Sequence, residues 1–274
     1  MSPTPGGAAE AERTTLVPPM SERMRFNARD FPYWLVIILG LLGWMGYLIL
    51  TNDEYGNAFD RISPGIWTTI RATITGFVLA LGLGLVAGLG RISKNPFIRN
   101  VAVTYIEFVR GVPILVLISM TAFVIVPQLS SAFGFDNSSV DFFWRAAIAL
   151  ALIYGAYLAE VFRAGIESVP RGQTEAGRAV GLSHRQTLRL IVLPQAVRNM
   201  APAIGNDLIA MLKDSSLLSV LGIRELTQEN KIFTAATFQY PAGYLVLTFF
   251  YLSMTLILSL LLRWYRKHLG LEND

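Results

Sequence analysis

The stretch EAGRAVGLSHRQTLRLIVLP, from Glu175 to Pro194, decides the fold prediction, because it is basic and punctuated by glycine where most of the chain is apolar. The 274 residues are 53% hydrophobic and only 15% charged. In a soluble domain about a quarter of the residues carry charge. The composition therefore predicts an integral membrane protein, and the stretch predicts a polar connection between two membrane spans.

The composition also excludes several kinds of functional site. The chain has no cysteine and only two histidines, His184 and His268, which excludes disulfides, thiolate nucleophiles and Cys/His zinc sites. The motifs HExxH, GxSxG and GxxxxGK[ST] are all missing. Any ATP that drives this protein must therefore be bound by another chain, and we expect no cofactor and no metal on this one.

Six segments are candidates for membrane spans. Hydropathy alone gives spans at 33–50, 72–90 and 241–262, each long enough for a hydrocarbon core of about 30 Å at a rise of about 1.5 Å per residue. Segments 97–126, 142–166 and 201–222 are further candidates that carry charges. A charge at the centre of a span costs about 2.5 to 3.5 kcal/mol, so these three helices should face a bundle interior or a water-filled path.

Seven of the charges within these spans are the candidate substrate path. They are Glu107 and Arg110 in the third span, Glu160 and Arg163 in the fourth, and Asp207, Lys213 and Asp214 in the fifth. Glu107 with Arg110, and Glu160 with Arg163, are one helical turn apart and can neutralise each other, which favours a structural role. For the three charges of the fifth span a structural role and contact with substrate both stay open.

Pro113 interrupts the third span and removes one backbone hydrogen bond. We expect a static kink there, with a gate hinge as the alternative.

The first 61 residues are predicted to precede the main membrane domain. Residues 1–30 are rich in proline and poor in apolar side chains, which predicts a disordered tail. Residues 31–61 are predicted to hold an extra transmembrane helix and an external loop. A cleaved signal sequence is the alternative, but no A-x-A site follows, and the apolar run exceeds the usual core of about 7 to 15 residues.

The basic residues predict the orientation of the chain. Lysine and arginine number 23, and they lie in short pieces between apolar runs, which favours membrane topology over nucleic-acid binding. With the N-terminus inside, only Arg61, Arg224 and Lys231 lie outside. Five more fall within spans, and the cytoplasmic side receives Arg13, Arg23, Arg25, Arg29, Arg91, Lys94, Arg99, Arg171, Arg178, Arg185, Arg189, Arg198, Arg263, Arg266 and Lys267. Both termini, including a short tail at 267–274, are therefore predicted to be cytoplasmic.

Small residues recur every fourth position in two of the spans. They are Gly76, Ala80, Gly84 and Gly88 in the second span, and Ala147, Ala151, Gly155 and Ala159 in the fourth. Such a stripe lets another helix approach backbone to backbone. Gly and Ala are common in membrane helices, but two unbroken stripes favour a packed bundle.

Segment 167–200 is the longest connection on the predicted cytoplasmic side. Pro170 and Gly172 break the preceding helix, a short helix follows at 173–180, and Gly181 stops it. Ser183 is an N-cap candidate with Gln186 three residues on, as in a capping box, and opens a second short helix that ends at Pro194.

At these residues the chain resembles the membrane subunits of bacterial ABC importers. Their pattern E-A-A-x3-G-x9-I-x-L-P is matched by Glu175, Ala176, Gly181, and the Ile191 to Pro194 segment; Gly177 stands where alanine is usual, which slightly loosens the helix. The phrases EFVRGVPILVL (107–117) and YGAYLAEVFRAGIESVPRGQTEAGRAVGLS (154–183) narrow the resemblance to permeases for polar amino acids such as histidine, glutamine, glutamate and arginine. It covers residues 62–266.

The resemblance implies an all-α integral membrane protein with a type I ABC importer-like bundle of six transmembrane helices, five of the core and one extra at the N-terminus. The loop at 167–200 would hold a coupling helix that seats in a groove of a separate ATPase subunit. Its candidate coupling residues are Gly172, Gln173, Glu175, Ala176, Gly177, Ala179, Gly181, Leu182 and Arg185. The alternative is a loop whose arginines only enforce topology.

The implied function is that of the translocation subunit of an ATP-driven, binding-protein-dependent importer of polar amino acids in the bacterial plasma (inner) membrane. It is not itself an enzyme. The implied partners are an ABC ATPase that binds ATP and magnesium, an external amino-acid-binding protein and a second permease, either identical or similar. An ion-coupled secondary transporter is the alternative, although the sequence shows no inverted repeat. A membrane enzyme lacks clustered His, Cys or paired acids.

Overall fold

The computed structural model describes residues 33–134, 136 and 140–268, and these residues contain helices and no strand. The predicted tail at 1–30 and residues 269–274 lie outside them. The chain divides into two compact units, 1–43 and 44–274. In the first, the described residues begin helix α1 (Tyr33–Thr51), which exposes Trp34, Ile37 and Leu39. The apolar helix predicted at 33–50 is therefore confirmed.

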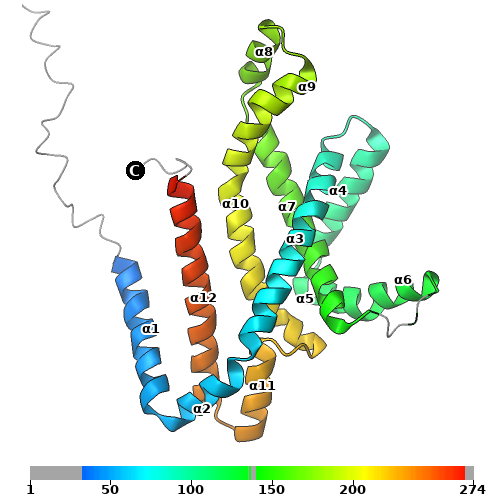
Figure 1. Ribbon diagram of the computed structural model, residues 1–274. Helices are drawn as coiled ribbons and strands as arrows, with labels where there is room; N and C mark the ends of the chain where they lie inside the picture. Colours follow the sequence, from blue (N-terminus) through cyan, green and yellow to red (C-terminus); the bar gives the residue numbers. More distant parts are fainter. Residues whose placement is uncertain (1–32, 135, 137–139, 269–274) are drawn as a thin grey trace, which may run out of the picture. The chain divides into compact units, whose positions relative to one another are not determined.

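The second unit is built around the pair α3 (Gly65–Arg91) and α7 (Phe142–Glu167), which share the most extensive contact between helices (Figure 1). A Cβ atom placed on Gly84 would lie 2.8 Å from Leu158 Cβ and 3.0 Å from the Gly155 carbonyl oxygen. One placed on Gly88 would lie 2.8 Å from the Ala159 carbonyl oxygen. The stripe of small residues on α3 therefore packs backbone to backbone against α7, as the sequence predicts.

The third predicted span is two helices and not one kinked helix. Helix α4 (Pro96–Gly111) ends before Val112, whose backbone is extended (φ −108°, ψ 139°), and Pro113 precedes α5 (Ile114–Met120). A π-helical turn (Thr121–Ile125) then leads into α6 (Val126–Ala132). Proline disfavours helical backbone at the residue before it, so the expected kink becomes a break. A hinge at Pro113 stays a prediction.

The fifth predicted span begins earlier than expected and ends in a tighter helix. Helix α10 (Leu193–Asp214) passes into a 3₁₀ helix (Ser215–Leu221), and Gly222 closes it in the left-handed region with φ +74°. Helix α12 (Tyr240–His268) contains the sixth predicted span and extends beyond it.

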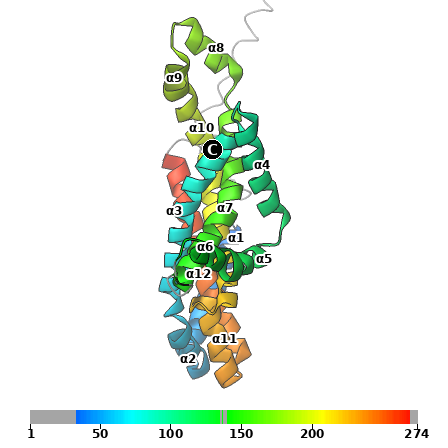
Figure 2. The same cartoon turned by 90° about the vertical axis from the view of Figure 1, so that its right-hand side faces the viewer.

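Two helices that were not predicted, α2 and α11, lie together at one end of the bundle. Helix α2 (Asp53–Ile62) occupies the predicted external loop, where the Asn52 side chain accepts a hydrogen bond from the Glu54 N–H. Helix α11 (Leu226–Thr237) precedes α12. Ile62, Leu226 and Phe250 join the three helices in one apolar cluster. We call this the α2–α11 end; α8 and α9 lie at the other end in both views (Figures 1 and 2).

Glu225 anchors the start of α11. Its carboxylate is fully buried and accepts hydrogen bonds from the Thr227 and Gln228 N–H groups at 2.9 and 2.8 Å. The Tyr251 hydroxyl of α12 donates to the same carboxylate at 3.0 Å. Burial raises the pKa of Glu225 to about 7, and the two N–H groups only partly offset this.

Five helical segments of the described chain are long and apolar enough to cross a membrane: 33–51, 53–91, 114–132, 142–167 and 240–268. Neither α4 nor α10 is among them. Helix α4 is short, with 16 residues, and α10 carries Arg198, Asp207, Lys213 and Asp214. The multi-span, all-helical class is confirmed, whereas the count of six spans stays a prediction.

The α3–α7 packing yields a paired test. Gly84→Ala should destabilise the protein by about 1 to 3 kcal/mol, because the added methyl group meets backbone atoms of α7. Gly82→Ala is the matched control, since a Cβ atom at Gly82 has nothing within 4 Å, and it should be neutral or slightly stabilising. Thermal unfolding in detergent compares the two. Equal effects of both substitutions would contradict the packing.

Glu225 predicts a pH dependence of stability. Its folded pKa of about 7 lies above the ordinary value of 4.5, so the folded state binds the proton more tightly. Stability should fall as pH rises from about 4.5 to 7 and level off above, with a contribution on the order of 3 kcal/mol. Glu225→Gln should flatten this slope in thermal unfolding measured across that range, while Glu54→Gln should leave it unchanged. An unaltered slope in Glu225→Gln would refute the assignment.

Candidate functional site

The segment between α7 and α10 forms a compact elbow, which we define as residues 168–192. Helix α8 (Arg171–Ala179) opens it, and the chain turns away at Gly181, whose φ of +87° lies in the left-handed region. The Leu182 N–H donates to the Gly177 carbonyl oxygen at 3.1 Å and the Gly181 N–H to that of Arg178 at 3.0 Å. These two bonds are those of a Schellman motif, so the predicted stop at Gly181 is confirmed.

The predicted capping box is also confirmed. The Gln186 N–H donates to Ser183 Oγ at 3.3 Å, and the Ser183 N–H donates to Gln186 Oε1 at 2.9 Å. This reciprocal pair fixes the start of α9 (His184–Thr187).

The second short helix does not end at Pro194, which corrects the prediction. A π-helical turn (Leu188–Val192) joins α9 to α10, and Pro194 lies in the first turn of α10. The Leu193 N–H bonds to the Leu188 carbonyl oxygen across this wider turn. The wider turn accommodates a proline that has no N–H to donate, so the helical path continues.

Gly177 lies where α8 packs against α9 and the π-helical turn that follows it. A Cβ atom there would lie 2.7 Å from Ile191 Cδ1 and 3.0 Å from Thr187 Cγ2. The glycine found where the family pattern has alanine therefore lets α8 lie closer to the following arm.

Most candidate coupling residues lie on the exposed surface of the elbow. Gly177 is buried and Leu182 is half-buried, whereas the other candidates are exposed: Gly172, Gln173, Glu175, Ala176, Ala179, Gly181 and Arg185. Val180, which the prediction missed, is 78% exposed beside Gly181. The sequence did offer a signal for Val180, since it is an apolar residue directly before the glycine that ends a polar helix. The exposed face thus combines charge, small residues and one apolar side chain.

The elbow is fastened where α7 and α10 meet. Asn199 Nδ2 donates to Ser168 Oγ at 2.8 Å, and that hydroxyl donates to the Gly165 carbonyl oxygen at 2.8 Å. A Cβ atom on Gly165 would lie 2.9 Å from Met200 Cβ. The two helices that carry the elbow are therefore in close contact at its base.

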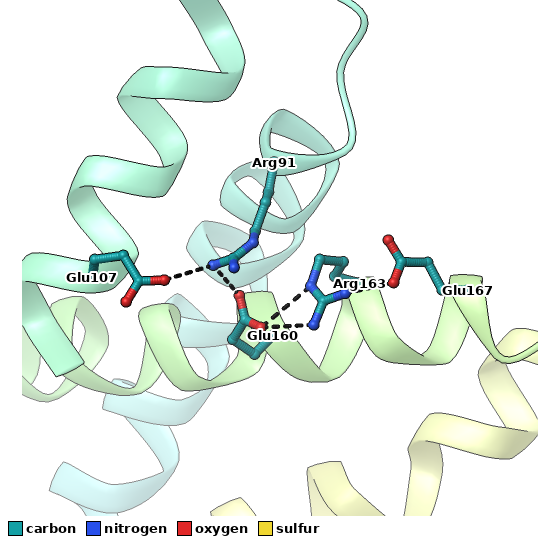
Figure 3. A network of polar contacts seen from close by, with 5 residues as sticks. All are labelled: Arg91, Glu107, Glu160, Arg163 and Glu167. Atoms are coloured by element: carbon teal, nitrogen blue, oxygen red, sulfur yellow. Dashed lines mark hydrogen bonds and ion pairs between the residues drawn. The ribbon is translucent and has the colours of Figure 1, made fainter.

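Near the same end, five charged side chains form a network across three helices (Figure 3). Arg91 Nη1, at the end of α3, lies 3.3 Å from Glu107 Oε1 of α4 and 2.5 Å from Glu160 Oε1 of α7. Arg163 Nη2 lies 3.0 Å from Glu160 Oε2, and its Nη1 lies 2.5 Å from Glu167 Oε2. The network therefore links α3, α4 and α7.

This network confirms one predicted pair and corrects the other. Glu160 pairs with Arg163 as expected, but Glu107 pairs with Arg91 and not with Arg110. Glu160 already holds Arg91 in place, so a fixed cation stands within reach of Glu107, whereas Arg110 is exposed at the end of α4. The interaction between helices replaces the local one.

The charges of the fifth predicted span divide differently. The Tyr154 hydroxyl of α7 donates to Asp214 Oδ2 at 2.8 Å, and Tyr154 is only 3% exposed. Asp207 Oδ2 is buried and has no hydrogen-bond partner among the described residues. The two carboxylates are two helical turns apart on one face of α10, about 10 Å along its axis. Lys213 is exposed, since neighbouring helix positions face different directions.

The described residues contain no group of His, Cys, Asp or Glu side chains that could hold a metal ion. The site therefore offers three arrangements: an exposed elbow, an ionic network at its base and two half-buried carboxylates on α10.

The Schellman motif gives a test of the elbow. Gly181→Ala should destabilise α8 by about 1 to 2 kcal/mol, because a side chain is strained at this backbone angle. Gly172→Ala is the control, since it has ordinary backbone angles and nothing within 4 Å of a Cβ atom. Amide hydrogen exchange of residues 171–182 should quicken only in Gly181→Ala. Unchanged exchange in that variant would contradict the motif.

The comparisons with known proteins agree with this architecture. Residues 80–270 match the family described as binding-protein-dependent transport system inner membrane component. The glutamine transport system permease protein GlnP of Escherichia coli K12 is 35% identical over 75% of this chain and 91% of the relative. The arginine transport system permease protein ArgU of Corynebacterium glutamicum is 35% identical over 85% of this chain and 78% of the relative.

A solved structure shares the fold as well. An amino acid ABC transporter crystallised with histidines aligns with a TM-score of 0.69 at 33% identity, covering 80% of this chain and 98% of that chain. On the family match, the relatives and this fold, the chain belongs to the inner membrane components of binding-protein-dependent transport systems and is a membrane-spanning permease subunit.

Proposed function

We propose that this subunit carries amino acids across the bacterial inner membrane in an importer driven by ATP. The two relatives are named for glutamine and arginine transport, and the aligned structure is an amino acid ABC transporter. The sequence has no phosphate-binding loop, so a separate ATPase subunit binds ATP and magnesium and performs the hydrolysis. A solute-binding protein delivers the amino acid at the α2–α11 end.

The distribution of lysine and arginine supports the orientation. The α8–α9 end carries Arg171, Arg178, Arg185 and Arg189, whereas the α2–α11 end carries Arg61, Arg224 and Lys231. The sequence-wide excess of basic residues on the side of the elbow supports an orientation with that side and both termini in the cytoplasm.

The elbow is the proposed contact with the ATPase. The observation that carries this proposal is how the elbow is built: the Schellman motif ends α8, the capping box starts α9, and the Asn199–Ser168 bond joins α10 to the end of α7. A rigid element can pass on a rigid-body displacement of the ATPase. The exposed Glu175, Arg185 and Val180 give the partner charged and apolar contacts.

The ionic network distributes that displacement. Arg91 ties α3 and α4 to Glu160 of α7, so a shift of α7 must carry the other two helices or break these ion pairs. Glu107, Glu160 and Arg163 therefore serve as a brace between helices and not as substrate contacts. Arg110, which is exposed, stays a candidate of the substrate path.

Asp207 and Asp214 are the proposed substrate-facing groups. A buried carboxylate oxygen without a partner, as in Asp207, is costly, and an ammonium group of a passing amino acid would satisfy it. Tyr154 orients the Asp214 carboxylate. Lys213 would meet a substrate carboxylate where two permeases face each other, either identical copies or similar subunits.

Reconstitution tests the function. Proteoliposomes holding this chain, its ATPase and its binding protein should take up labelled glutamine or arginine only with ATP on the side of the ATPase. Glu175→Arg should lower co-purification of the ATPase at least tenfold, because it reverses a charge on the elbow. Glu54→Arg, an exposed reversal on α2, is the matched control and should leave the association intact.

Two outcomes would contradict the proposal. Full-rate uptake in ATP-depleted vesicles under an ion gradient would favour a secondary transporter. An equal fall in ATPase co-purification in Glu54→Arg would show that the elbow is not the site where the ATPase binds.

A further inference from the structure

A pocket of about 510 Å³ lies between the end of α3, the first turns of α4 and the end of α7. Its lining includes three arginines, Arg91, Arg99 and Arg163, together with the Ser93 hydroxyl and one carboxylate, that of Glu167. Three guanidinium groups around one small pocket are the donors that proteins use for phosphate groups.

The three arginines differ in how far their donors are already used. Arg163 bonds to Glu160 through Nε and Nη2 and to Glu167 through Nη1, so each of its three nitrogens already has a carboxylate partner. Arg91 contacts Glu107 and Glu160 through Nη1 alone. No hydrogen bond or ion pair of the Arg99 side chain occurs in the described part of the chain. The pocket therefore presents free donors from Arg91 and Arg99 beside a guanidinium that is fixed.

The surroundings of the pocket are apolar and suit a membrane lipid. Ile92 and Val103 also line it. The adjacent turns of α4 expose Phe97 (74%) and Val101 (55%), and such a surface is suited to acyl chains. A basic pocket between helices at the cytoplasmic boundary of a bilayer is placed to receive an anionic headgroup.

We propose that this pocket binds the phosphate group of an anionic phospholipid of the cytoplasmic leaflet, held by Arg99 and by the free Nε and Nη2 of Arg91. The inference rests on the proposed orientation, which puts this end of the bundle in the cytoplasm. It requires neither transport nor a partner subunit. The lipid phosphate would bridge the α3–α4 turn to the ionic network through Arg91.

Lipid titration followed by native mass spectrometry tests the pocket. The full-length chain in a neutral detergent should bind phosphatidylglycerol at least tenfold more tightly than phosphatidylcholine. Arg99→Gln should remove this preference, because it deletes the arginine that has no structural partner. Arg99→Lys should keep part of it, since charge remains while the planar fork is lost. Lys94→Gln is the matched control, as this exposed lysine does not line the pocket.

Competition with inorganic phosphate separates the two sources of the ligand. Retention of phosphatidylglycerol in millimolar phosphate is expected, because the lipid also contacts the apolar rim. Full displacement by phosphate would overturn the assignment to lipid. Unchanged preference in Arg99→Gln, or equal loss in Lys94→Gln, would overturn the pocket itself. Since no step measures uptake, these outcomes are independent of the reconstitution test.

Discussion

The close approach of α3 to α7 is the constraint on which the other contacts depend. Gly84 and Gly88 bring the two backbones together, and the end of that contact lies beside Ala159. Glu160 follows directly on α7, and Arg91 lies one turn beyond Gly88 on α3. The ion pair between Arg91 and Glu160 can form because the glycine stripe brings the two helices close together. A larger residue in the stripe would thus weaken an interaction that it does not touch.

Inside a membrane the hydrophobic effect does not bring helices together, because the lipid is as apolar as the side chains. Packing and polar contacts must supply the specificity. In this chain the small residues define how close α3 and α7 lie, and the charges define which way the neighbouring α4 faces. Glu107 is drawn to a cation on α3, so α4 is tied to the central pair near one end. At its other end, α4 stops at Val112, and the chain turns into α5.

Much of this architecture could be predicted from the sequence wherever a local rule applied. The glycine and alanine stripes, the stop at Gly181 and the Ser183–Gln186 capping box each depend on residues close in sequence, and the structure confirms all three. Family resemblance likewise identified the class. Membership of a broad family can be recognised from the sequence because the family's motif lies in one continuous stretch.

The misses have a common physical cause, which is that the deciding partner lies far away in sequence. Arg91 and Glu107 are held together by a third residue, Glu160, on another helix. Helix α2 is stabilised by burial of Ile62 against α11 and α12. The polar sequence of α2 alone does not predict that cluster. Pro194 was expected to end a helix, but the π-helical turn before it lets the helix continue.

That continuity has a mechanical consequence for the proposed transport cycle. From His184 to Asp214 the chain is helical without a break, so the second half of the elbow and the carboxylates of Asp207 and Asp214 belong to one continuous helical arm. Tyr154, which holds Asp214, belongs to the other arm, α7. If a partner displaces the elbow so that α10 and α7 shift relative to each other, the Tyr154–Asp214 hydrogen bond is among the contacts that must change. A displacement applied at the elbow would therefore alter the hydrogen bonding of Asp214, 22 residues beyond the end of the elbow, with no separate signal between them.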